Sequence, residues 1–329
     1  MQKNKILTSK RMLWADIMRI VAIYLVVQLH TYQLPFTLSK ITLLCIPLFI
    51  MLSGALLLEK EENYKIFFFK RCVKVLLPWI VWTGIYMIYF LYILQPTQIS
   101  ILYFNGKNTL FIEWLRYFYR MFLSALWFFP LIFSLYIITP VMRIFVRHAR
   151  YFDNIYVLFL WFICLSIVPF LFHTALLPEW SPNIIYTLIQ YSGYYLLGAF
   201  LIGKNKQLLR SRRMLYLFLI GFFMVFFSTN YLDPRTVIAS IATFMLIIIF
   251  SNHMEKIITV SVRKLLTKVS GACLGIYVVH TLIATFFVNE RVYLQSHHGE
   301  ILFTFLLFVT SAVVVLILQK IPIIKHIVP

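Results

Sequence analysis

Residues 13–34 read LWADIMRIVAIYLVVQLHTYQL, an apolar run that is long enough to cross a bilayer as a helix. Two charged side chains, Asp16 and Arg19, and a histidine, His30, interrupt the run. A charged group deep in a membrane helix costs at least about 2.5–3.5 kcal/mol on insertion, so such groups are rare and mark candidate functional sites. This run therefore predicts a transmembrane helix and also the region where the chemistry of the chain belongs.

Similar apolar runs continue to the end of the chain. Of the 329 residues, 62% are hydrophobic and only 12% are charged, whereas about a quarter are charged in a soluble domain. This composition excludes a soluble enzyme, and we predict an all-α, polytopic membrane protein that forms a single domain over residues 1–329. The ten expected spans are 13–34, 41–58, 75–95, 121–142, 155–177, 184–203, 214–230, 236–252, 271–288 and 300–319. Residues 109–120, before the fourth span, are predicted to form an interfacial helix.

Basic residues dominate the charge of the chain. There are 30 Lys and Arg against 11 Asp and Glu, which gives a formal net charge of +19. If the amino terminus is cytoplasmic and the chain crosses ten times, most of these basic residues fall in cytoplasmic segments, as the positive-inside rule requires. We therefore predict that both termini are cytoplasmic. This topology accounts for the excess of basic residues, so we expect no nucleic-acid partner.

The polar residues of the first run lie on one helical face. Asp16 and Arg19 are three residues apart and are neighbours on a helix. His30 follows eleven residues after Arg19, which places it within about 20° of the same face and about 16 Å farther along the axis. Two interpretations stay open: a neutralising pair near the interface with His30 reaching the other surface, or a functional polar stripe across the membrane.

His280 is a second histidine within a predicted span. It ends the sequence LGIYVVH at residues 274–280. A membrane histidine can simply hydrogen-bond a neighbouring helix, or it can take part in proton transfer. The only adjacent pair of histidines, His297 and His298, has no second ligand cluster near it in the sequence, so we expect no metal site.

A basic segment precedes the third span. Residues 59–74 read EKEENYKIFFFKRCVK, and Lys70, Arg71 and Lys74 can share one turn of a helix at the cytoplasmic surface. One interpretation is an ordinary positive-inside anchor. The other is a patch that binds the phosphates of an anionic cytosolic ligand.

Six short motifs follow one another along nearly the whole chain. They are WADIMR leading to His30 (14–30), IPLFIMLSG (46–54), FKRCVK leading to Pro78 (69–78), LWFFP (126–130), YYLLG (194–198) and LGIYVVH (274–280). The first contains an arginine, ten residues and a histidine. This ordered set resembles the acyltransferase-3 family of integral membrane acyltransferases, and it is particularly similar to the members that O-acetylate enterobacterial common antigen.

The resemblance implies a multi-pass helical fold in a bacterial plasma (inner) membrane. It implies acetyl-CoA or another acyl-CoA as the cytosolic donor, and a hydroxyl of a cell-surface glycan or lipid-linked sugar as the acceptor. Membrane lipid is then the remaining partner, and neither a metal nor a nucleic acid is expected.

It also implies roles for the stripe. His30 would remove the proton of the acceptor hydroxyl, or carry the acyl group as a nucleophile. Arg19 would stabilise developing negative charge or hold a phosphate or carbonyl of the donor, and Asp16 would orient Arg19. His280 is a further candidate for proton transfer.

The basic segment would hold the donor. Lys70 and Arg71 would attract the nucleotide end of coenzyme A, together with Lys74, which stands where family members often carry an arginine. An exporter of glycan stays an alternative, because intramembrane charges also line transport routes. A structural or sensory protein is a third, and it would make Asp16, Arg19 and His30 dispensable.

Overall fold

The computed structural model describes residues 12–31, 39–89, 118, 126–172, 184–203, 212–287 and 297–328. Throughout these ranges the regular elements are helices and no strand occurs, which confirms the predicted all-α class. The predicted interfacial helix at 109–120 lies outside the described residues, apart from Phe118. The elements are α1 (Leu13–His30), η1 (Lys40–Leu44), α3 (Cys45–Leu57), α4 (Tyr64–Arg71), η2 (Cys72–Leu76), α5 (Leu77–Tyr89), α8 (Phe128–His148), α9 (Tyr151–Phe162), η4 (Ile163–Ile167), α10 (Val168–Phe172), α11 (Ile184–Gly203), α12 (Arg212–Phe223), η6 (Met224–Phe227), α13 (Pro234–Ile257), α14 (Val260–Gly271), α15 (Cys273–Phe286), α16 (His297–Leu318) and η8 (Ile324–His326).

The number of spans depends on how short and bent helices are counted. Within the described ranges, seven helices are long and apolar enough to cross a membrane, and the bent pair α14 and α15 makes up to eight. Two shorter apolar helices, Leu188–Gly203 and Arg213–Phe227, coincide with the sixth and seventh predicted spans. Each of the ten predicted runs therefore corresponds to a helical segment, and the polytopic membrane fold is confirmed.

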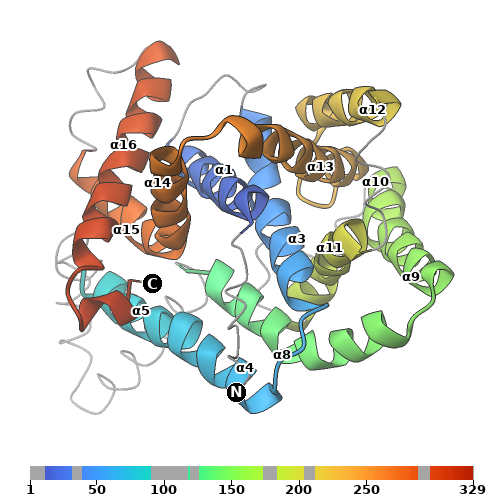
Figure 1. The fold of residues 1–329 in the computed structure, drawn as a ribbon, viewed down its shortest axis with the longest axis horizontal. Coiled ribbons are helices and arrows are strands. Elements are labelled where there is room, and N and C mark those ends of the chain that lie inside the picture. The colour runs from blue at the N-terminus through green and yellow to red at the C-terminus, as the bar shows by residue number, and fades with distance from the viewer. Residues whose placement is uncertain are drawn as a thin grey trace, which may run out of the picture.

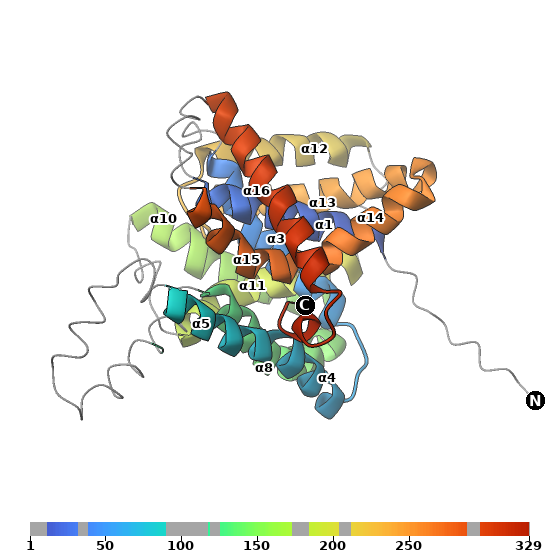
Figure 2. The same ribbon diagram turned by 90° about the vertical axis from the view of Figure 1, so that its left-hand side faces the viewer.

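Helices α1 and α3 lie in the middle of the bundle (Figure 1). Helix α1 contacts α3 and α13 on one side and α14, α15 and α16 on the other. Figure 2 shows α4, α5 and α8 together at one end of this arrangement. Helices α3 and α11 cross at very close range, because a Cβ on Gly54 would meet the Tyr195 carbonyl and a Cβ on Gly198 would meet the Met51 carbonyl. Only glycine allows backbones to approach this closely.

The third apolar helix begins earlier than the sequence predicted. The prediction placed its start at residue 75, but α4, η2 and α5 run continuously from Tyr64 to Tyr89. The side chain of Asn63 caps the start by accepting a hydrogen bond from the Lys65 amide. The π turn η2 ends two residues before Pro78, and the π turn η4 likewise ends two residues before Pro169. A proline lacks the amide that a regular helix needs at this point, so the preceding turn widens.

A sharp bend separates α14 from α15. The two helices meet at Ala272 with an angle of 66° between them. Both contact α1, so residues from either side of the bend reach the polar face of the first helix.

Candidate active site

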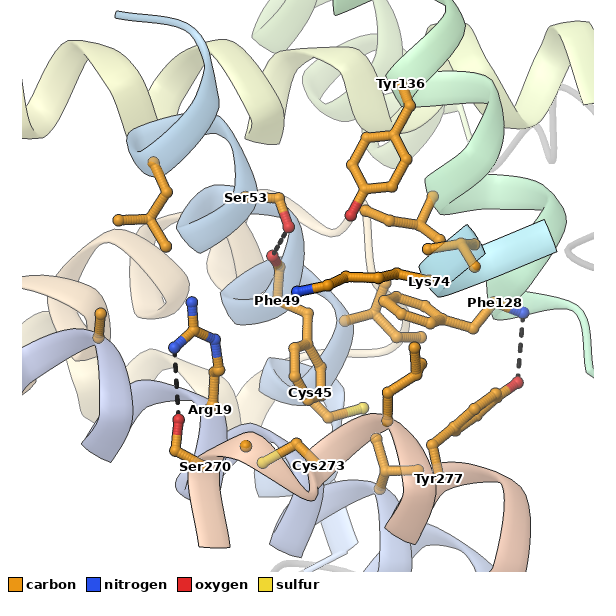
Figure 3. A pocket seen from close by; sticks show the side chains of 18 of the residues that line it. Arg19, Cys45, Phe49, Ser53, Lys74, Phe128, Tyr136, Ser270, Cys273 and Tyr277 are labelled. Atoms are coloured by element: carbon orange, nitrogen blue, oxygen red, sulfur yellow. Dashed lines mark hydrogen bonds between the residues drawn. The ribbon is translucent and has the colours of Figure 1, made fainter. Parts of the chain in front are cut away.

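A cavity of about 680 Å³ lies beside α1 and is also lined by α3, η2, α8, α14 and α15 (Figure 3). Figure 3 shows Arg19 and Lys74 reaching into it from opposite sides, with the Lys74 ammonium directed toward Ser53. The lining includes both Met12 and His30, so the cavity follows α1 over 18 residues, or about 27 Å of helix. Its polar lining side chains are Arg19, His30, Ser53, Lys74, Tyr136, Ser270 and Tyr277.

Asp16 and Arg19 form the predicted pair at one end of the cavity. Arg19 Nη1 lies 3.3 Å from Asp16 Oδ1, and the Asp16 side chain is buried beneath it. Helix α14 supplies further contacts: the Ser270 hydroxyl donates to Asp16 Oδ1 at 2.7 Å, and the Thr267 hydroxyl donates to Asp16 Oδ2 at 3.3 Å. The buried carboxylate is thus held by donors from two helices. Arg19, which is partly exposed to the cavity, is the member of the pair that can meet a ligand.

His30 and His280 meet at the other end of the stripe. His30 Nδ1 lies 2.9 Å from the Val26 carbonyl and 3.3 Å from His280 Nε2. His280 Nδ1 lies 2.8 Å from the Tyr277 carbonyl. Because a carbonyl can only accept, Nδ1 carries the proton on both rings. His280 Nε2 is then an acceptor for the His30 N–H, and the lone pair of His30 is on Nε2, for which the described residues provide no hydrogen-bond donor.

Arg19 and His30 line the same cavity, but they are too far apart to contact the same atom of a ligand. They are eleven residues apart on α1, which is about 16 Å along the helix axis. A group that His30 can reach is therefore beyond the reach of Arg19. Of the two roles considered for Arg19, this separation favours holding a distant part of a ligand over stabilising charge next to His30.

The three basic residues of the predicted donor patch lie in different surroundings. Lys74 lines the cavity. The Arg71 guanidinium lies over the rings of Phe67 and Tyr136, at 5.1 and 5.2 Å from their centroids. Lys70 is exposed and donates to Glu62 Oε1 at 2.7 Å, and this hydrogen bond lowers the pKa of Glu62. The segment is helical as expected, but its basic residues do not converge on one point.

Tyr277 is a candidate that the sequence interpretation did not single out. Its hydroxyl accepts a hydrogen bond from the Phe128 amide at 3.4 Å (Figure 3). Its ring centroid lies 6.2 Å from that of His280. Since the hydroxyl accepts this bond, its own proton can be donated to a ligand in the cavity. The spacing of three residues between Tyr277 and His280 on one helix was the available signal.

Comparison with known proteins identifies the family. Residues 12–320 match the family described as "Acyltransferase domain", the acyltransferase-3 family. The chain belongs to this family. No curated protein and no solved structure matched. The closer similarity to the acyltransferases of enterobacterial common antigen therefore stays a prediction.

Membership makes the chain a membrane acyltransferase, which needs an acyl donor and an acceptor. The comparisons give no support to the exporter alternative. The described part of this acyltransferase contains no group of three or more His, Cys, Asp or Glu side chains arranged to hold a metal ion.

Proposed function

We propose that this acyltransferase moves an acetyl group from cytosolic acetyl-CoA to a hydroxyl of an extracytoplasmic glycan or lipid-linked sugar at a bacterial plasma membrane. The observation that carries the proposal is the shared cavity, with the cations of Arg19 and Lys74 in one part and the lone pair of His30 Nε2 in another. An acyl-CoA has the same division, because its negative charges lie on the nucleotide and its thioester lies at the opposite end.

His30 acts as the general base. Nε2 takes the proton of the acceptor hydroxyl while the hydroxyl oxygen attacks the thioester carbonyl carbon. The carbon–sulfur bond then breaks, and the proton passes from His30 to the leaving thiolate. The products are the acetyl ester and the free thiol of coenzyme A.

His280 positions this base. As His30 becomes an imidazolium, its Nδ1–H is shared between the Val26 carbonyl and His280 Nε2, and both acceptors favour the charged ring. The Tyr277 hydroxyl is the candidate donor to the carbonyl oxygen as negative charge develops there.

Arg19 and Lys74 hold the donor. Their charges lie in the part of the cavity away from His30, where the phosphates and the pantetheine carbonyls of an extended acyl-CoA would lie. Asp16 keeps Arg19 in place through the contacts described above, and Arg71 and Lys70, on the helical turns next to Lys74, increase the positive potential around it.

The test is release of free coenzyme A from acetyl-CoA by purified protein, with a lipid-linked sugar acceptor present. We expect His30→Ala to lower the rate about 10²- to 10⁴-fold, the usual contribution of a general base. His253→Ala is the matched control, because His253 makes the same Nδ1 contact with a carbonyl four residues earlier, at 2.9 Å, but on the exposed surface. Equal rates for the wild type and the His30 variant would remove His30 from the chemistry.

A further inference from the structure

A second, polar cavity lies beside the first. It has a volume of about 400 Å³ and is lined by Glu61, Glu62, Asn63, Tyr64, Arg143 and Arg147. It lies between the segment that precedes α4 and the last turns of α8, and α4 and α8 lie side by side in Figures 1 and 2. None of the roles assigned above uses this cavity.

Arg143 is the unusual member of its lining. The residue is 2% exposed, and its Nε donates to the Leu57 carbonyl at 2.8 Å. Both terminal nitrogens, Nη1 and Nη2, are buried and have no hydrogen-bond partner among the described residues. The guanidinium also lies 4.6 Å from the centroid of the Phe67 ring. A buried cation with unused donors is unfavourable, so its two free nitrogens need an acceptor from outside the protein.

The carboxylates of this cavity are already paired with other cations. Glu62 lies 2.7 Å from Lys70 and 3.5 Å from Lys60. Glu61 lies 3.6 Å from Arg147. Arg143 itself makes no ion pair with either glutamate, so its positive charge is available to an anion.

We propose that this cavity binds a phosphate monoester, with Arg143 as its principal ligand. Two nitrogens in the plane of a guanidinium match two phosphate oxygens, a pairing that lysine cannot reproduce. This inference rests on the proposed function, because acetyl-CoA carries one such group, the 3′-phosphate of its nucleotide.

The two cavities are close enough for one donor to occupy both. Tyr136 lines the first cavity and Arg143 the second, and they are seven residues apart on α8, which is about 10 Å. Arg71 lies between them, over the rings of Tyr136 and Phe67, and Phe67 in turn contacts Arg143. The nucleotide would thus lie near Arg143 while the thioester arm extends along the first cavity toward His30.

The experiment compares three probes by calorimetry on the full-length protein in phosphatidylcholine nanodiscs. The probes are acetyl-CoA, 3′-dephospho-acetyl-CoA and adenosine 3′,5′-bisphosphate. The wild type should bind acetyl-CoA about 10- to 100-fold more tightly than the dephospho form, the range for charge-assisted hydrogen bonds. Arg143→Met should bind both equally. Arg150→Gln is the matched control and should behave as the wild type, because Arg150 is an exposed cation that lies outside the cavity.

The outcomes separate this inference from the proposed function. If the wild type binds acetyl-CoA and its dephospho form equally, the phosphate site is wrong and the donor assignment stands, whether or not Arg143→Met folds. If adenosine 3′,5′-bisphosphate binds in an Arg143-dependent way and acetyl-CoA does not, the donor is wrong as the source of the phosphate. If phosphatidic acid added to the nanodiscs displaces the bisphosphate from the wild type and acetyl-CoA does not, a lipid headgroup is the source of the phosphate monoester, and the assignment of this cavity to the acyl donor is overturned.

Discussion

Replacing His280 with leucine removes the nitrogen that lies 3.3 Å from His30 Nδ1 while it keeps most of the side-chain volume. The Val26 carbonyl remains at 2.9 Å, so His30 keeps its tautomer and its lone pair on Nε2. In the proposed mechanism, the variant loses one of the two acceptors for the imidazolium of His30. A hydrogen bond to a charged group is worth about 1.5–3 kcal/mol, which corresponds to a decrease in kcat of about 10- to 150-fold.

The assay is acetyl-CoA turnover at saturating acceptor, with KM for acetyl-CoA measured for each variant. We expect His280→Leu to lower kcat and to leave KM within a factor of about two, because the lost contact strengthens only as charge develops. His280→Gln restores an acceptor near the Nε2 position and should recover part of kcat. A loss confined to KM, or equal activity of the leucine and glutamine variants, would refute the argument, since a purely structural role predicts no such rescue.

Three further perturbations test the surroundings of the site. Asp16→Ala should destabilise the protein by about 1–3 kcal/mol, a range that allows for the partial exposure of Arg19, and Asp16→Asn should cost less; equal Tm values for the wild type and the alanine variant would contradict this. Gly198→Ala should cost about 1–3 kcal/mol, because its Cβ would meet the Met51 carbonyl, whereas Gly84→Ala has nothing within 4 Å and should leave Tm unchanged or raise it. Glu62 has a lowered pKa in the folded protein, so its contribution to stability is complete above the unfolded-state pKa of about 4.3 and is lost as the pH falls through the lower folded-state value. Glu62→Gln should therefore show a smaller fall in Tm than the wild type between pH 5 and pH 3. Parallel curves of Tm against pH for the two proteins would show that the pair with Lys70 contributes nothing.

The fold class could be predicted from the sequence because few backbone structures are stable inside a lipid bilayer. Runs of about twenty apolar residues must satisfy their backbone hydrogen bonds internally, and helices do so. The predicted third span began at residue 75 because Lys70, Arg71 and Lys74 interrupt the apolar run, although the helix that carries them begins at Tyr64 and continues without a break into α5. Asn63, which caps that helix, was the local signal for the correct start.

The candidate site was only partly predictable, because several of its contacts join helices that are far apart in the sequence. Helical periodicity places Asp16 and Arg19 together, and the 3.3 Å contact between them confirms it. It does not say that Ser270 reaches Asp16, or that His280 faces His30, because each contact joins residues about 250 positions apart. The burial of Arg143 could not be predicted either, since hydropathy does not reveal which basic side chain is enclosed by the fold.

The polar contacts at the two ends of the stripe fix how α1 packs against α14 and α15. Ser270 on α14 contacts Asp16 and Arg19, and His280 on α15 contacts His30. Along α1 the arginine and the histidine are eleven residues apart, and along the bent pair their partners are ten apart. The two contacts therefore fix the register of α1 against α14 and α15 at both ends. A shift of α1 by one residue would turn its polar face by about 100° and break both contacts together, so packing against α14 and α15 places Arg19 beside Ser270 and His30 beside His280, whereas α1 itself sets the distance between Arg19 and His30.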